Sequence, residues 1–263
     1  MRVAMTSVAA PGHPNEDFTG AVPDAAVLID GAGIPGADSV CRHGVVWYAH
    51  RLGGALLSRL SQGRERSLAA LLADAIEQVT DSHRDSCDVA DPISPSATVA
   101  LLRRRDGLVE HLVLGDSVVV LARVAGAPLV SADRREVIIS GAYQSILEGI
   151  TPGSDEYHRV LAELRANRNQ PGGFWLAKDD PRAAYEAVTG SLPVTELTGA
   201  VLLSNGASRI VDRFGLTDWP GLVALLGSSG AAGVIQRVRQ AEARHEVPSD
   251  DATITFCTEL DRC

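Results

Sequence analysis

Hydrophobic and polar positions follow two different periods along the chain, and each period predicts one kind of element. Apolar residues recur at helical spacing over 47–60 and 67–80, which predicts two amphipathic helices. Short apolar runs bounded by glycines and polar turns predict strands, and in the first half they lie at 1–10, 25–29, 97–103, 109–114, 118–124 and 128–130. We expect the last four of these strands to form an antiparallel meander.

The second half of the chain carries further elements of both kinds. Apolar spacing predicts helices over 219–226 and 231–244, and the highly charged segment 154–168 predicts an exposed helix. Strands are expected at 174–177, 200–204 and 251–257. Because strands and helices come in runs and do not alternate strictly, the pattern favours the α+β class. We expect one domain over 1–263, with two antiparallel sheets flanked by helices.

One aromatic pair follows two glycines and allows two interpretations. Gly172 and Gly173 precede Phe174 and Trp175. The glycines could form a loop that faces a ligand, or a bend into a strand whose aromatic rings fill the core. We favour the second interpretation.

Composition and charge exclude several classes of partner. The chain has 263 residues, of which 45% are hydrophobic, so it can bury a sizeable core. Its net charge of −9 argues against binding to a nucleic-acid backbone. Charged residues interrupt the long apolar run 108–125, and the N-terminus lacks the apolar core of a signal peptide. We therefore expect a cytoplasmic protein with neither nucleic acid nor membrane as a partner.

The four cysteines are scattered and form no Cys-x-x-Cys pair. Four cysteines in a chain of this length do not make a disulfide scaffold, so we expect reduced thiols. Cys41 and Cys257 are interpreted as small buried hydrophobic residues.

Acidic residues stand beside small residues at the ends of predicted strands. These positions are 15–17, 30–31, 115–117 and 249–251, and 204–206 has the same shape with an amide, Asn205. Each one alone suits a turn or a cap. Together, side chains at strand ends can converge in space, where clustered carboxylates need cations such as Mg²⁺ or Mn²⁺.

These segments occur in the order of the motifs of one family. Over nearly the whole chain the sequence resembles the type-2C family of metal-dependent Ser/Thr protein phosphatases. The matching segments are Asn15-Glu16-Asp17, Val27-Leu28-Ile29-Asp30-Gly31-Ala32-Gly33, Ser96-Ala97-Thr98, Leu114-Gly115-Asp116-Ser117, Leu202-Leu203-Ser204-Asn205-Gly206 and Asp250-Asp251-Ala252-Thr253-Ile254.

The resemblance implies a fold and a chemistry. The fold is a β-sandwich of two antiparallel sheets with helices outside, in the layer order α, β, β, α. The site would hold two Mn²⁺ or Mg²⁺ ions, with Asp30 bridging both and serving as the catalytic residue. The Gly31 carbonyl would assist, and Glu16 and Asp250 would hold ions directly or through water. A hydroxide between the ions would attack phosphoserine or phosphothreonine of a phosphoprotein without forming a phosphoenzyme.

The sequence departs from the family pattern at two metal positions. Asn205 stands where the family has an acid, so its amide oxygen would hold the second ion more weakly. Arg209 stands where the family often has another acid, so we do not expect a regular third metal site at Asp116. Arg209 itself is either a surface arginine or a fixed cation in that space.

Two further departures concern the substrate. Gly12 replaces an arginine that often holds the phosphate, and Ala32 replaces a histidine that some members have after Asp-Gly. His13, Arg42 and His43 lie near these motifs in sequence and are candidate substrate-binding residues. Each histidine also suits a turn, a cap or a helix surface.

The departures leave two functions open. One is a phosphatase; the other is a pseudophosphatase that keeps the fold and acts as a binding or regulatory module. The persistence of Glu16, Asp30, Asp116 and Asp250 favours the enzyme. An unrelated α+β protein with chance motifs is a third, weaker alternative.

Overall fold

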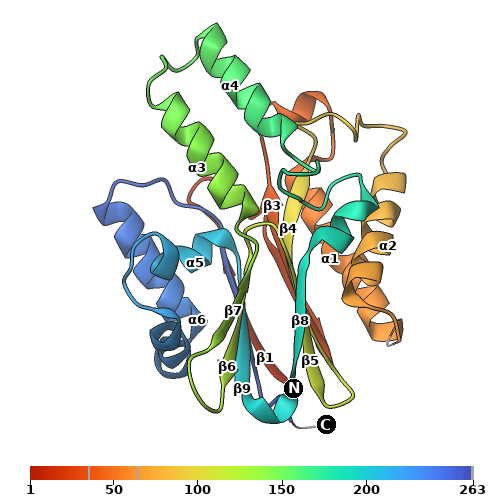
Figure 1. The fold of residues 1–263 in the computed structure, drawn as a ribbon, viewed down its shortest axis with the longest axis vertical. Helices are drawn as coiled ribbons and strands as arrows, with labels where there is room; N and C mark the ends of the chain where they lie inside the picture. Colours follow the sequence, from red (N-terminus) through yellow and green to blue (C-terminus); the bar gives the residue numbers. More distant parts are fainter. Residues whose placement is uncertain (35, 64, 262–263) are drawn as a thin grey trace.

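Two five-stranded antiparallel sheets lie face to face at the centre of the computed structural model, which describes residues 1–34, 36–63 and 65–261 (Figure 1). The first sheet has the order β1-β10-β9-β6-β7, with strands Arg2–Val8, Ala252–Thr258, Leu197–Leu203, Val118–Arg123 and Leu129–Ala132. The second has the order β2-β3-β4-β5-β8, with strands Phe18–Val22, Ala25–Ala32, Ser96–Arg105, Leu108–Leu114 and Val188–Pro193. The expected α+β sandwich is confirmed.

Helices cover the outer faces of both sheets. Helices α1 (Gly44–Gln62) and α2 (Leu68–Asp81) pack on the second sheet, whereas α5 (Asn205–Asp212) and α6 (Trp219–Arg244) pack on the first (Figure 1). Helices α3 (Arg135–Leu147) and α4 (Asp155–Ala166) pack against each other and project beyond one end of the sandwich. Three short 3-10 helices complete the described elements: η1 (Ala37–Ser39), η2 (Pro181–Glu186) and η3 (Val194–Glu196).

Strand β3 shows why the central strands appear as continuous apolar runs. Its side chains point alternately to the two faces of the sheet. Val27 and Ile29 join the core under α1 and α2, while Ala26 and Leu28 join the core between the sheets. A strand buried on both faces has no polar alternation, and β3 carries its first carboxylate at Asp30, near its end.

The predicted meander is wrong. Strand β4 pairs with β5, and β6 pairs with β7, but β5 continues to β8 while β6 continues to β9. The chain therefore changes sheets in the turn 115–117, between β5 and β6. Periodicity along one strand reports its burial but not its partner, so the sequence pattern could not show this crossing.

Segment 174–177 is also not a strand. It forms isolated bridges, from Phe174 to Arg168 and from Ala177 to Ala97. The rings of Phe174 and Trp175 are buried, and Trp175 belongs to the core under α1 and α2. The interpretation that these aromatic rings fill the core is therefore confirmed, while the expected strand is not.

The two helices expected over 219–226 and 231–244 are the two arms of α6, joined at Gly230. Gly230 has φ +67°, a conformation that glycine adopts readily, and it breaks the helical geometry there. Within the described residues, α6 is the one helix long and apolar enough to cross a membrane by length and composition alone. Core helices pass the same test, and here Leu222, Val234 and Val238 are buried against the first sheet.

Candidate metal centre

The end of β3 brings two predicted ligands together. Asp30 pairs with Thr98 in the ladder between β3 and β4, and Gly31 follows it. A Cβ on Gly31 would lie 2.6 Å from the Glu16 carbonyl oxygen and 2.6 Å from Cγ1 of Val45. Only glycine therefore lets the segment around Glu16 lie directly against the end of β3. This close approach places Glu16 beside the Asp30-Gly31 pair.

The start of α5 supplies the next group. The Asn205 backbone N–H donates to Asp30 Oδ2 at 2.9 Å, as suits a carboxylate at a helix N-terminus. The Asn205 side-chain Nδ2 donates to Asp116, which lies in the turn after β5. A Cβ on Gly206 would lie 1.9 Å from the Asp251 carbonyl oxygen, so this position also requires glycine. Four segments that are distant in sequence thus meet at one end of the sandwich.

Two carboxylates organise this end by binding its backbone and side chains. Asp251 accepts hydrogen bonds from the backbone N–H of Ala10 at 2.7 Å and of Glu16 at 2.6 Å. Asp17 Oδ2 accepts from Thr253 Oγ1 at 2.6 Å. Neither acid is among the predicted site residues, although both lie inside the matched segments 15–17 and 250–254. Their position in those segments, next to the predicted ligands Glu16 and Asp250, is the sequence signal that could have identified them.

Arg209 is a fixed cation within an ion-pair network. Its Nη2 lies 2.6 Å from Asp250 Oδ2, and its Nη1 lies 2.8 Å from Glu242 Oε1. The other Glu242 oxygen pairs with Arg239 at 2.8 Å. The Arg209 side chain is only 14% exposed, so the structure favours the fixed-cation interpretation over a surface arginine. Asp250, a predicted metal ligand, therefore already has a positive partner.

The carboxylates at this end destabilise one another's charge. Burial, followed by the charges of Asp17 and Asp116, raises the pKa of Asp30 well above its usual value, although the Asn205 N–H opposes this. Burial raises the pKa of Asp17 to about 7, and it also raises the pKa values of Asp116 and Glu16. Raised carboxyl pKa values indicate negative charge without enough compensation. Bound cations would supply that compensation.

The donor set fits hard divalent cations. Carboxylate, amide and backbone carbonyl oxygens are the ligands that Mg²⁺ and Mn²⁺ prefer. Asp17 Oδ1 is buried and has no hydrogen-bond partner among the described residues, so this oxygen is free to bind a cation or a water. Because Asn205 Nδ2 is engaged by Asp116, its amide oxygen is the atom left to bind an ion.

A cavity of about 390 Å³ adjoins these ligands. Asp116 and Asn205 line it, together with three arginines, Arg134, Arg209 and Arg213. Arginine forks match phosphate geometry, so this cavity is a candidate position for a phosphorylated side chain. Arg134 and Arg213 were not predicted from the sequence, because neither stands in a matched segment.

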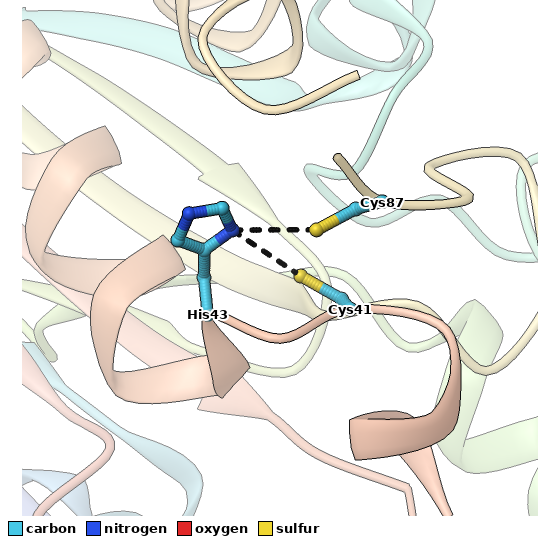
Figure 2. Close-up of side chains that lie close together, drawn as sticks. All are labelled: Cys41, His43 and Cys87. Carbon is cyan, nitrogen blue, oxygen red and sulfur yellow. Dashed lines mark hydrogen bonds between the residues drawn. The ribbon is translucent and has the colours of Figure 1, made fainter. Parts of the chain in front are cut away.

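The candidate substrate-binding residues have different surroundings. His13 is exposed, and its charge lowers the pKa of Glu16, so it lies close to the carboxylates. Arg42 is exposed next to His43. The His43 ring stacks on Trp47, with ring centroids 4.4 Å apart, and its Nδ1 faces two cysteines (Figure 2). A substrate role for all three residues stays a prediction.

The fold and the carboxylate cluster define a candidate metal-binding hydrolase. The model of the protein phosphatase 2C family matches residues 6–179, more than half of the chain. The chain therefore belongs to the protein phosphatase 2C family, as the motifs in the sequence predicted. The family's members are Ser/Thr phosphatases, which are hydrolases.

Solved structures agree with this assignment. The serine/threonine phosphatase PstP/Ppp of Mycobacterium tuberculosis matches with a TM-score of 0.62 at 16% identity, covering 98% of this chain and 97% of that one. Stp1 from Staphylococcus aureus gives a TM-score of 0.64 at 14% identity, covering 97% and 94%. The PstP catalytic domain in complex with two manganese ions gives 0.58 at 18%, covering 98% and 97%. At these identities the likeness shows the fold. A comparison with curated protein sequences found no match.

Proposed function

We propose that the chain is a metal-dependent protein Ser/Thr phosphatase that uses two Mn²⁺ or Mg²⁺ ions. The observation that carries this proposal is the convergence of Asp30 with Glu16, Asp116 and Asn205 at one end of the sandwich. Family membership supports metal dependence. The phosphoprotein substrate and a cytoplasmic location remain predictions.

Each residue has a role in this proposal. The residues that would hold the ions are Asp30, Glu16, Asp250, the Gly31 carbonyl and the Asn205 amide oxygen. When bound, the two ions supply Lewis acidity and a water of lowered pKa. The Asn205 backbone N–H holds Asp30 in place. Because burial and neighbouring acids raise the pKa of Asp30, its negative charge would depend on the bound ions.

The substrate would lie across the adjacent cavity. Arg134 and Arg213 face this cavity and would bind the phosphate oxygens. His13, near Glu16, is a candidate for a further contact with the same phosphate. In its protonated form this imidazole would donate a proton to the departing serine or threonine oxygen.

A second function has its own support. Arg209 neutralises Asp250, and Asn205 brings no charge, so the cations meet fewer negative ligands than an all-carboxylate site offers. Weak metal binding would favour a pseudophosphatase that binds phosphoproteins without hydrolysing them. The two functions share one fold and differ in turnover.

Phosphate release from a phosphothreonine peptide and from p-nitrophenyl phosphate in Mn²⁺ separates them. We expect wild type to exceed Asp30→Ala by about 100-fold or more, because loss of an outer-shell group alone costs 10–100-fold. Asp81→Ala is the matched control, since Asp81 is exposed on α2 and pairs with Arg84. A wild type no faster than Asp30→Ala would refute the phosphatase and leave the binding module.

A further inference from the structure

Three side chains that are not among the candidate ligands of the carboxylate site converge from two segments. Cys41 and His43 lie just before α1, and Cys87 lies in the loop after α2 (Figure 2). The His43 Nδ1 is 3.3 Å from the Cys87 sulfur and 4.0 Å from the Cys41 sulfur. All three candidate ligand atoms lie within 4.8 Å of one another. This arrangement is more than two thiols in contact, because one nitrogen faces both sulfurs.

The spacing suits a tetrahedral metal ion. With Zn–S of about 2.3 Å and Zn–N of about 2.0–2.1 Å, tetrahedral ligand atoms are separated by roughly 3.5–3.8 Å. The observed distances of 3.3 Å and 4.0 Å lie on either side of that range. Two thiolates and one imidazole are a soft donor set that selects zinc over magnesium or manganese.

The surroundings hold these ligands in place and leave a path for an ion. The Asp88 backbone N–H donates to the Val40 carbonyl at 2.9 Å and ties the two segments together. The His43 ring is stacked on Trp47, which limits its rotation. Cys41 is buried, as expected, whereas His43 and Cys87 are half-buried and open to solvent on one side.

We propose that Cys41, His43 and Cys87 form a second metal site, which binds Zn²⁺ through two thiolates and one imidazole. The fourth position would be taken by water. Binding replaces the two thiol protons, which pass to solvent, and changes no oxidation state. This site shares none of its ligands with the candidate metal centre, so its zinc binding can be tested separately from the proposed phosphatase activity.

The zinc site would also fix part of the candidate metal centre. Val45 lies on the first turn of α1, four residues after Cys41, and its side chain limits the space at both Gly31 and Gly33. An ion that joins Cys41 to Cys87 would therefore tie the start of α1, where Val45 lies, to the loop after α2. We infer a structural role for zinc, acting on stability.

Cobalt substitution in the reduced full-length chain tests the site. Co²⁺ bound by thiolates gives a sulfur-to-metal charge-transfer band, which oxygen ligands do not produce. We expect this band in wild type and in Asp30→Ala, and its displacement by Zn²⁺. Cys87→Ser should lose most of the band and bind Zn²⁺ at least about tenfold more weakly in chelator competition. The control Cys257→Ala, at a buried cysteine in β10, should keep it.

Three outcomes would overturn the proposal. The first is the absence of the band in wild type, and the second is an undiminished band in Cys87→Ser. The third is a Cys41–Cys87 disulfide that mass spectrometry still finds in protein kept in a reductant. Circular dichroism guards against misfolding of the Cys87 variant, and His43→Gln gives an independent loss of one ligand. Zn²⁺ should raise the melting temperature of wild type by more than that of Cys87→Ser, which keeps only the carboxylate site.

Discussion

Asn205→Asp tests whether the candidate metal centre is a weakened form of an all-carboxylate site. The Asn205 side chain donates a hydrogen bond to Asp116, and its backbone N–H donates to Asp30. The substitution removes the side-chain donor and adds a negative charge next to these two acids. It should therefore destabilise the metal-free protein and strengthen its attraction for cations.

The size of the destabilisation follows from these contacts. A hydrogen bond to a charged group contributes about 1.5–3 kcal/mol. Two like charges about 4 Å apart repel by about 4 kcal/mol at an effective dielectric constant of 20. Protonation relieves part of this repulsion, because burial already raises the pKa of Asp116. We expect a net loss of about 2–4 kcal/mol at pH 8, or a melting temperature lower by about 5–12 °C.

Manganese should offset part of this loss of stability. An extra carboxylate ligand should lower the dissociation constant for Mn²⁺ at least about tenfold, which is worth about 1.4 kcal/mol. Thermal melting with and without Mn²⁺, together with calorimetric titration, measures both effects. Asn205→Ala removes the same donor without adding charge, and Asn167→Asp makes the same change at the end of α4. If Mn²⁺ raised the melting temperature of wild type and Asn205→Asp equally, Asn205 would not lie among the ligands.

Three further predictions concern neighbouring residues. Burial raises the pKa of Glu136 from 4.5 to about 8. Between these two pH values the folded protein therefore keeps a proton that the unfolded chain has already released. Glu136→Gln should therefore raise the free energy of unfolding in urea by about 2 kcal/mol at pH 8 and hardly at pH 5. Gly206→Ala should cost more than about 3 kcal/mol in thermal melting, because its Cβ would meet the Asp251 carbonyl oxygen. Arg209→Ala should free Asp250 and tighten Mn²⁺ binding in calorimetry, while it lowers stability by about 1–3 kcal/mol.

Each of these predictions has a contrary result. Gly227 lies in α6, where a Cβ would meet no atom within 4 Å, so Gly227→Ala should be neutral or stabilising. Equal losses from the two glycine substitutions would contradict the steric argument. A gain from Glu136→Gln of the same size at both pH values would rule out titration as its cause. Weaker Mn²⁺ binding after loss of Arg209 would show that the arginine supports the ligands and does not compete with the ions.

The central strands and helices α1 and α2 could be predicted because their buried faces give regular patterns of apolar residues. Strands β2 and β8 could not, since they lie at sheet edges and their side chains are mostly half-buried or exposed. Helix α3 could not be predicted for the same reason. Leu147 is its one buried residue among those described, and Val137 and Ile138 are exposed. An element with little buried face leaves little pattern.

The candidate metal ligands could be proposed from the order of short motifs, but the partners of their side chains could not. The ion pair between Arg209 and Asp250 joins positions 41 residues apart, so no local sequence pattern could predict it. Cys41 was interpreted as a small buried residue, and its burial is confirmed, as is that of Cys257. The approach of Cys87 to Cys41 depends on how the loop after α2 folds back, which only the three-dimensional structure shows.

The placement of β10 has a consequence for the order in which the molecule can be built during synthesis. Strand β1 pairs with β10, so β1 waits for its partner until about 250 further residues have been made. At about 5–20 residues per second, this wait lasts on the order of 10–50 s. For most of it, Glu16 and Asp30 are on the growing chain without Asn205, and Asp250 follows only directly before β10. A nascent chain therefore cannot complete the candidate metal centre until the segment that leads into β10 has been made.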